Sequence, residues 1–238
     1  MPTDVLVMIS KKIEKNTKPQ TKLYFYYWNN VGSRIIDGIS KRWEILAFDK
    51  KDALNFNIRY VGGFYNYNNC DERENASNSS KLFFAGTNGG RFQSLRKLEK
   101  LLNKQQYDCN FKYVSPLGAF FNPFFYSRPF SYSTIIKFTL NSKAIVEWMK
   151  SGQVGLTLRS YEALFFNRKL ITNNKYIKNY NFYDPSYIFI YESEESLKHL
   201  EEFLLKPIDV GKQSYFKKQY SYERWFKTVI EGKQNYDV

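Results

Sequence analysis

The stretch SKLFFAGTNGGRFQSLRKLEKLLNK, residues 80–104, holds the clearest secondary-structure signals in the chain. Residues 80–87 form an apolar run between polar residues, which predicts a β-strand. Residues 91–104 place apolar side chains at helical spacing, namely Phe92, Leu95, Leu98, Leu101 and Leu102. One face of this predicted helix is therefore apolar, and we expect it to pack against a core.

Strand and helix signals recur on both sides of this stretch. Upstream, strands are predicted at 22–28, 43–48 and 62–69, with a helix that starts after Asp49 and ends at Gly62 and Gly63. Downstream, strands are predicted at 133–140 and 186–193 and helices at 141–152 and 194–206, with an irregular stretch at 155–166. The order strand, helix, strand pair, helix is thus given twice, which predicts an internal duplication and a pseudo-twofold molecule.

The composition is basic and rich in aromatic side chains. Of 238 residues, 36 are Lys or Arg and 23 are Asp or Glu, which gives a net charge of +13, and there are 20 Tyr and 21 Phe. A phosphate-rich partner would offset this charge. AT-rich coding DNA is the alternative source of this bias, and it accounts for the aromatic residues better than for the excess of cations.

The sequence also argues against several classes of protein. No run approaches the roughly 18 apolar residues of a membrane span, and the first residues lack the basic start and cleavage site of a secretory signal. We therefore expect no membrane partner. The chain has two cysteines, Cys70 and Cys109, and one histidine, which argues against a zinc site and favours reduced thiols.

The segment LGAFFNPFF, residues 117–125, resembles the motif of LAGLIDADG homing endonucleases. Five residues match the helical half of that motif, namely Leu117, Gly118, Ala119, Phe120 and Phe121. A weaker copy, NNVGSRIIDG, places Gly32 at the small packing position and Asp37 at the acidic end. The tail resembles the family's closing pattern in Pro207, Lys212 and Trp225.

The resemblance implies an α+β fold of two pseudo-symmetric αββαββα-like repeats, whose antiparallel sheets form a saddle. The repeats would meet at Gly32 and at residues 117–121. The expected divisions are an N-terminal extension at 1–21, a first repeat at 22–107, a second repeat at 108–206 and a C-terminal tail or helix at 207–238. An internal repeat makes a monomer sufficient.

The same resemblance implies that DNA cleavage has been lost. Two-metal hydrolysis needs carboxylates from both repeats, and Phe124 stands where the second acid would be. Asp37 is then only a vestigial candidate. We expect no cofactor and no metal site, with Mg²⁺ required only if cleavage is retained.

The expected function is therefore binding of nucleic acid, most readily RNA, without catalysis. The protein would be a structural component of an organellar ribonucleoprotein such as a mitochondrial ribosome, or an intron maturase. Its partners would be rRNA or intron RNA and neighbouring proteins, in the mitochondrial matrix or another organelle; a cytoplasmic location is the alternative. Alternating rings, amides and cations would contact the RNA, and the candidate residues are Lys22, Tyr24, Tyr26, Lys41, Arg42, Arg59, Tyr65, Asn66, Tyr67, Lys137 and Lys212. For each tyrosine, packing in a half-buried sheet is the alternative.

Other functions stay open. One is an active homing endonuclease, and another is a structural protein of a phage or other assembly that contacts no nucleic acid. A loose ADP-ribosyltransferase pattern exists in Ser133-Thr134 and Glu192-Ser193-Glu194, but the glutamates fit a helix N-terminus better. His199 lies on a polar helix face, where a lone histidine is typically exposed.

Overall fold

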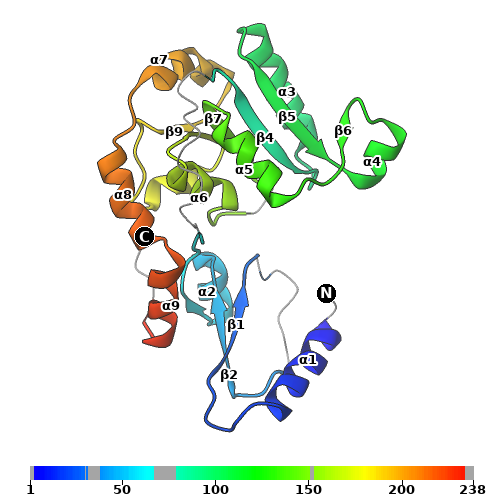
Figure 1. The fold of residues 1–238 in the computed structure, drawn as a ribbon, viewed down its shortest axis with the longest axis vertical. Helices are drawn as coiled ribbons and strands as arrows, with labels where there is room; N and C mark the ends of the chain where they lie inside the picture. Colours follow the sequence, from blue (N-terminus) through cyan, green and yellow to red (C-terminus); the bar gives the residue numbers. More distant parts are fainter. Residues whose placement is uncertain (1–2, 30, 32–37, 67–78, 151–152, 234–238) are drawn as a thin grey trace. The chain divides into compact units, whose positions relative to one another are not determined.

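The structure is a computed structural model that describes all residues except 1–2, 30, 32–37, 67–78, 151–152 and 234–238 (Figure 1). The chain forms two compact units. The first contains Met1–Gly63 and Trp225–Asp237, and the second contains Phe64–Arg224. The changes between units fall within the stretches that the sequence analysis assigns to the first repeat and to the C-terminal tail.

The first unit is built on a small parallel sheet in the order β1-β2-β3. Its elements are α1 (Thr3–Lys15), β1 (Leu23–Tyr27), β2 (Trp43–Ala47), α2 (Lys50–Phe56), β3 (Arg59–Tyr60) and most of α9 (Tyr222–Ile230). Leu46, Val61 and Val229 form one of its buried clusters, against which Tyr24, Tyr26 and Trp225 pack.

Helix α2 begins as the sequence predicts but ends early. The Asp49 carboxylate accepts hydrogen bonds from the backbone N–H groups of Lys51 and Asp52, at 2.9 and 3.1 Å, and so satisfies donors that a helix N-terminus leaves unpaired. The helix ends at Asn57, which adopts the left-handed conformation with φ 51°. The chain therefore reverses into β3 before it reaches Gly62 and Gly63.

The second unit is a six-stranded parallel sheet in the order β6-β5-β4-β7-β8-β9. Its strands are β4 (Leu82–Thr87), β5 (Cys109–Val114), β6 (Tyr126–Ser127), β7 (Ala144–Glu147), β8 (Lys169–Thr172) and β9 (Ile188–Ile190). Its helices are α3 (Phe92–Lys104), α4 (Pro116–Phe121), α5 (Tyr132–Leu140), α6 (Leu158–Phe165), η1 (Lys175–Asn179), η2 (Glu194–His199), α7 (Leu200–Leu205) and α8 (Val210–Gln219).

Helices cover both faces of this sheet. On one face, Leu82 and Phe84 of β4 pack with Leu95 of α3 and Leu200 of α7. On the other, Phe83 and Ala85 of β4 pack with Ile135 of α5, and Ile145 and Leu170 of the neighbouring strands pack with Leu164 of α6. Alternate residues of one strand therefore enter different cores, as the period of two requires.

The strand order shows where the chain changes direction across the sheet. It runs outward from β4 through β5 to β6, then returns to place β7 on the other side of β4 and continues outward to β9 (Figure 1). This is the doubly wound order, and its crevice opens where the connections leave β4 and β7 in opposite directions.

The prediction of two repeats with antiparallel sheets that form a saddle is wrong. Every ladder between the described strands is parallel. Residues 133–140, predicted as a strand, lie in helix α5, and residues 141–152, predicted as a helix, contain strand β7. All four residues of β7 are buried, and a strand covered on both faces lacks the alternation that distinguishes strands from helices. Exchanging these two elements created the false repeat.

Of the other element predictions, two are wrong: the described residues of 62–69 contain an isolated bridge at Tyr65 but no strand, and the stretch expected to be irregular at 155–166 contains helix α6. The following predictions are confirmed. Strands β1, β2, β4 and β9 and helix α3 lie within the ranges that the sequence predicts, and 194–206 is helical as η2 and α7. Among the described residues, none of the helices combines the length and apolar character needed to cross a bilayer.

Lys169, the first residue of β8, fixes the start of that strand to two neighbouring segments. Its Nζ donates to the carbonyl oxygens of Ser186 at 2.7 Å and Phe203 at 2.5 Å, and it lies 4.4 Å from the Phe203 ring centroid. Burial, followed by the nearby charges of Lys143 and Lys206, lowers the pKa of Lys169 from 10.5 to about 8.

The titration of Lys169 makes stability depend on pH in a defined window. Between pH 8 and 10.5 the unfolded chain binds more protons than the folded one at this residue, so this lysine raises the free energy of unfolding as the pH rises through that window. We predict that the difference in unfolding free energy between the wild type and Lys169→Met changes with pH only there. Urea unfolding at a series of pH values, followed through Trp148, measures it; a constant difference from pH 7 to 10.5 would contradict the prediction.

Candidate functional site

The loop between β4 and α3, at the carboxyl edge of the sheet, contains two consecutive glycines. Gly89 and Gly90 have φ values of +53° and +80°, which residues with a side chain rarely adopt. A Cβ on Gly89 would lie 2.5 Å from Cε of Lys150, whereas a Cβ on Gly90 would meet nothing within 4 Å. The Lys150 side chain therefore covers Gly89, whereas the space beside Gly90 is open.

The amide groups of this loop are available to a ligand. Neither Gly89 nor Gly90 donates a backbone hydrogen bond to any residue in the described part of the chain. Helix α3 begins at Phe92, whose N–H donates to Oδ1 of Asn88 at 3.2 Å. Free N–H groups before a helix N-terminus, together with the helix dipole, favour a bound anion.

Arg91 holds the loop against the neighbouring strand. Its Nε donates to the carbonyl oxygen of Thr87 at 3.1 Å, and its terminal nitrogen donates to the carbonyl oxygen of Trp148. Trp148 in turn donates its indole N–H to Oγ of Ser94 at 2.9 Å. Burial lowers the pKa of Arg91, opposed by the charge of Glu147 and assisted by that of Arg159. Arg91 thus joins the ends of β4 and β7.

Lys150 supplies a free cation at the same place. It follows β7 by three residues, its side chain is exposed, and its stem lies against Gly89. No described residue forms a hydrogen bond or ion pair with its ammonium group. An unpaired ammonium beside unpaired amides is an arrangement that binds phosphate or another anion.

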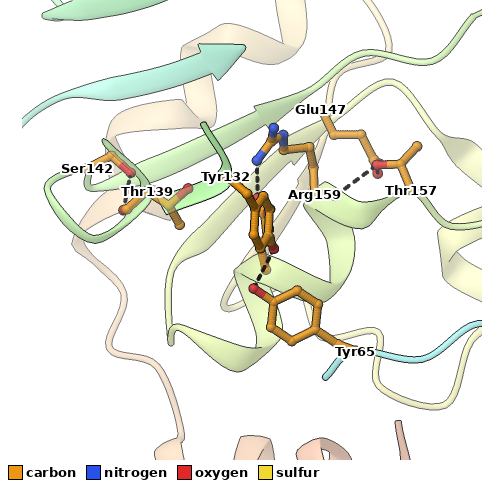
Figure 2. Close-up of polar contacts among 8 residues, drawn as sticks. Tyr65, Tyr132, Thr139, Ser142, Glu147, Thr157 and Arg159 are labelled. Carbon is orange, nitrogen blue, oxygen red and sulfur yellow. Dashed lines mark hydrogen bonds and ion pairs between the residues drawn. The ribbon is translucent and has the colours of Figure 1, made fainter. Parts of the chain in front are cut away.

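Glu147, the last residue of β7, is a buried carboxylate with 1% of its surface exposed. Oε1 accepts hydrogen bonds from Oγ1 of Thr157 and from Oγ of Ser160, the latter at 2.5 Å, and Oε2 accepts from Oγ1 of Thr172 at 2.6 Å. Figure 2 shows the contact with Thr157. Glu147 therefore ties β7 to β8 and to the first turn of α6.

A second buried carboxylate lies in the middle of α6. Glu162 is fully buried and accepts hydrogen bonds from Arg159 and, at 3.0 Å, from the Tyr132 hydroxyl. The Tyr132 and Tyr65 hydroxyls point toward one another, 2.7 Å apart (Figure 2). Burial raises the pKa of Glu162, and the charge and hydrogen bond of Arg159 oppose that rise. This chain of polar groups joins α6 to α5 beneath the carboxyl edge.

The two carboxylates near the crossover are therefore engaged, whereas Lys150 and the glycine amides have no hydrogen-bond partner among the described residues. The open part of the site, beside Lys150 and the glycine amides, is consequently positively charged. Among the described residues, no three His, Cys, Asp or Glu side chains gather as ligands for a metal ion. The geometry suits a small anionic group seated between the β4–α3 loop and Lys150.

A pocket of about 300 Å³ lies elsewhere in the second unit. It is lined by Ser79, Ser80, Tyr107, Lys143, Glu201, Leu204 and Leu205. Several of these residues immediately precede β4, β5 and β7, so the pocket is at the amino edge of the sheet. Doubly wound sheets bind ligands at the opposite, carboxyl edge, and for this reason the crossover is the candidate site.

The residues predicted to bind RNA are divided between the two units. Six belong to the first unit and four described ones to the second. Several are already engaged: Tyr26 donates to the carbonyl oxygen of Gly62 at 2.8 Å, Arg42 donates to carbonyl oxygens of Glu14 and Lys18, and Arg59 binds Glu44 and the carbonyl oxygens of Val229 and Lys233.

The other predicted residues have varied environments. Tyr24 is half-buried and Tyr65 is buried, while Lys212 forms an ion pair with Asp184 at 2.6 Å. Lys22, Lys41, Asn66 and Lys137 are exposed. Gly32, Asp37 and Tyr67 lie outside the described residues.

The segment expected to join two repeats instead forms the short helix α4. Ala119 is buried, but Leu117, Phe120 and Phe121 are exposed. Gly118 packs closely on the Tyr126 ring, because a Cβ there would lie 2.7 Å from two ring atoms. The small residue therefore allows contact with the adjacent strand segment.

Comparison with known proteins identifies the type of fold. No family model matches the sequence, and no curated protein matches it significantly. Among solved structures, the Glycosylation Associate Protein (Gap123) complex from Streptococcus agalactiae is similar over 94% of this chain and 52% of the matched chain, with 14% identity and a TM-score of 0.54. Sucrose-phosphate synthase from Thermosynechococcus elongatus is similar over 94% of this chain and 70% of its own, with 8% identity and a TM-score of 0.55.

These neighbours correct the resemblance drawn from the sequence. The fold is Rossmann-like, with parallel sheets as in these structures, and the LAGLIDADG assignment is wrong. The expectation of a homing-endonuclease-derived RNA-binding or ribosomal protein rested on that assignment and is withdrawn with it. The chain spans about half the length of the first of these structures.

Sequence reasoning passed over the residues that build the candidate site. Asn88, Gly89 and Gly90 lie between a predicted strand and a predicted helix, and that position was itself the available signal for an anion-binding loop. Lys150 and Glu147 were assigned to a helix, so their place at the end of a parallel strand was not recognised.

Removing the Glu147 carboxylate should destabilise the second unit. Glu147→Ala would leave the hydroxyls of Thr157, Ser160 and Thr172 without their acceptor, and a buried polar group left unpaired costs about 1–3 kcal/mol. Urea unfolding followed through Trp148 should show a loss of at least this size. Glu192→Ala, at an exposed glutamate paired with Lys178 at 3.5 Å, is the control and should change little. Equal losses in both variants would contradict the role of Glu147.

Proposed function

We propose that the second unit binds the diphosphate of a nucleoside-diphosphate sugar at the crossover between β4 and β7, and that the chain takes part in glycosyl transfer. The observation that carries this proposal is the glycine loop at the doubly wound crossover, whose amides, like Lys150, have no partner among the residues that the structure describes. The likeness in fold to sucrose-phosphate synthase supports a sugar nucleotide as the source of the phosphate.

Each part of the loop has a role in holding the diphosphate. The amides of Gly89 and Gly90 donate to phosphate oxygens, and the N-terminal end of α3 adds a favourable dipole. Gly90 has open space beside it, so the ligand approaches the backbone closely. Lys150, whose stem lies against Gly89, supplies a full positive charge beside these amides.

Neighbouring residues keep this arrangement rigid. Arg91 is committed to carbonyl oxygens of β4 and of the residue after β7, and it positions the loop rather than the ligand. Glu147 fixes the end of β7, from which Lys150 extends three residues later. Preorganised donors lose little entropy when the anion binds.

Glycosyl transfer needs this kind of anion site for a chemical reason. The acceptor's hydroxyl oxygen forms a bond to the sugar's anomeric carbon and releases its proton to solvent. The bond between that carbon and the diphosphate oxygen breaks, and the departing diphosphate takes the electron pair and gains negative charge. Fixed donors and a cation stabilise that charge more in the transition state than in the substrate. Lys150 and the loop amides are placed to supply such stabilisation.

A binding experiment tests the proposal. UDP, GDP, CDP and ADP, each with a matching sugar conjugate, would be titrated by calorimetry at low salt. At least one should bind, and Lys150→Gln should weaken it by roughly tenfold or more, because a charge-assisted hydrogen bond contributes about 1.5–3 kcal/mol.

Lys104→Gln is the matched control. It makes the same change of charge at the exposed opposite end of α3 and should leave the affinity near the wild-type value. The proposal is wrong if no nucleotide in the panel binds, or if both variants weaken binding equally. Release of free nucleotide from the bound conjugate in the presence of a sugar acceptor measures transfer; tight binding without such release would contradict the glycosyl-transfer part alone.

A further inference from the structure

Helix α4 and the turn after it expose large apolar side chains in an unusual arrangement. Leu117, Phe120, Phe121 and Phe124, which we call the aromatic knob, have exposed fractions of 71%, 74%, 75% and 102%. The small residues of the same segment point the other way, since Ala119 is buried and Gly118 lies against Tyr126. The usual order of burial, with large apolar residues inside, is inverted.

The knob is held firmly in this orientation. Ser115 caps α4 by accepting from the N–H of Gly118 at 3.0 Å, and close packing of Gly118 on Tyr126 excludes any larger residue. Beyond the helix, Phe125 stacks on Tyr113 with ring centroids 5.0 Å apart. The guanidinium group of Arg96 lies over the Phe125 ring, 4.0 Å from its centroid. The residues beneath the knob are therefore well packed, and they hold the four exposed side chains at the surface.

The charge around the knob has one sign. Residues 109–146 contain no Asp or Glu, but include Lys112, Arg128 and Lys137. Arg128 directly follows β6, is exposed, and pairs with no described residue. On α3, Glu99 is already engaged as the acceptor of the Tyr113 hydroxyl at 2.8 Å. The segment that carries the apolar side chains therefore contains cations and no carboxylates, and Arg96 lies over the adjacent Phe125 ring.

We infer that the aromatic knob inserts into the interface of an anionic lipid bilayer, with Arg128 and Arg96 contacting phosphate headgroups. Phenylalanine and leucine enter the boundary between headgroups and acyl chains, and basic neighbours add attraction to anionic lipids. A projecting knob needs no matching groove in a bilayer, whereas a protein partner would need one. This is peripheral binding, which requires no spanning helix, and it is independent of the nucleotide site at the crossover.

Vesicle flotation of the full chain tests this inference. Vesicles of phosphatidylcholine mixed with phosphatidylglycerol should carry the protein with them, and pure phosphatidylcholine should carry much less. The triple variant Phe120→Ser/Phe121→Ser/Phe124→Ser should bind the mixed vesicles roughly tenfold or more weakly. Arg128→Glu should also weaken binding, and added salt should reduce the binding of the wild type.

A matched triple variant controls for general loss of surface apolarity. Leu205→Ser/Val210→Ser/Tyr215→Ser removes exposed apolar side chains from α7 and α8 of the same unit and should bind like the wild type. Because the knob is exposed, its triple variant should keep the unfolding midpoint of the wild type. As a second measurement, Trp introduced by Phe121→Trp should shift its emission to the blue when mixed vesicles are added.

Three outcomes would overturn the inference. In the first, the wild type binds no vesicle; in the second, the knob variant binds as well as the matched control. In the third, the wild type self-associates in the absence of lipid and the knob variant is monomeric, which would assign the knob to a second copy of the chain.

Discussion

The parallel pairing of β4 with β7 is the constraint on which the site depends. The two strands are joined through Leu82 with Ala144 and Phe83 with Ile145, although β5 and β6 lie between them in the sequence. Parallel strands cannot be joined by tight turns, so each requires a crossover connection. The connections from β4 and β7 leave in opposite directions, and the carboxyl ends of both strands are left accessible between them.

Side chains buried beneath that edge maintain this opening. Glu147 could be placed in the interior only because three hydroxyl groups satisfy its oxygens, and Glu162 because Arg159 and Tyr132 do so. Burying charged groups without partners is strongly unfavourable. The partners come from β8, α5 and α6, so the polar network fixes the relative positions of the elements that surround the crossover. Lys150 and the glycine amides, by contrast, have no such partners among the described residues and remain able to bind a ligand.

Local elements were predictable where one physical signal dominated. The single apolar face of α3 and the Asp49 cap of α2 are local properties, and both predictions hold. The prediction for residues 133–147 is wrong because α5 and β7 are both apolar, and β7 is buried on both faces. Whether each forms a helix or a strand depends on which neighbours cover it. Once α5 was read as a strand and β7 as a helix, a false repeat followed, and it gave LGAFFNPFF a role at an interface that the structure lacks. The candidate site was missed for the same reason, since Gly89 and Lys150 approach only when β7 lies beside β4.

Amide hydrogen exchange tests most directly whether ligands bind where the two strands meet. With a nucleoside-diphosphate sugar that binds the chain, exchange should slow at residues 88–94 and 148–150, because the glycine amides gain phosphate acceptors and the crevice closes around the ligand. Residues that line the pocket at the amino edge, such as Tyr107 and Leu204, should exchange as before. Protection confined to that amino edge, with no change at Gly89 and Gly90, would contradict the account.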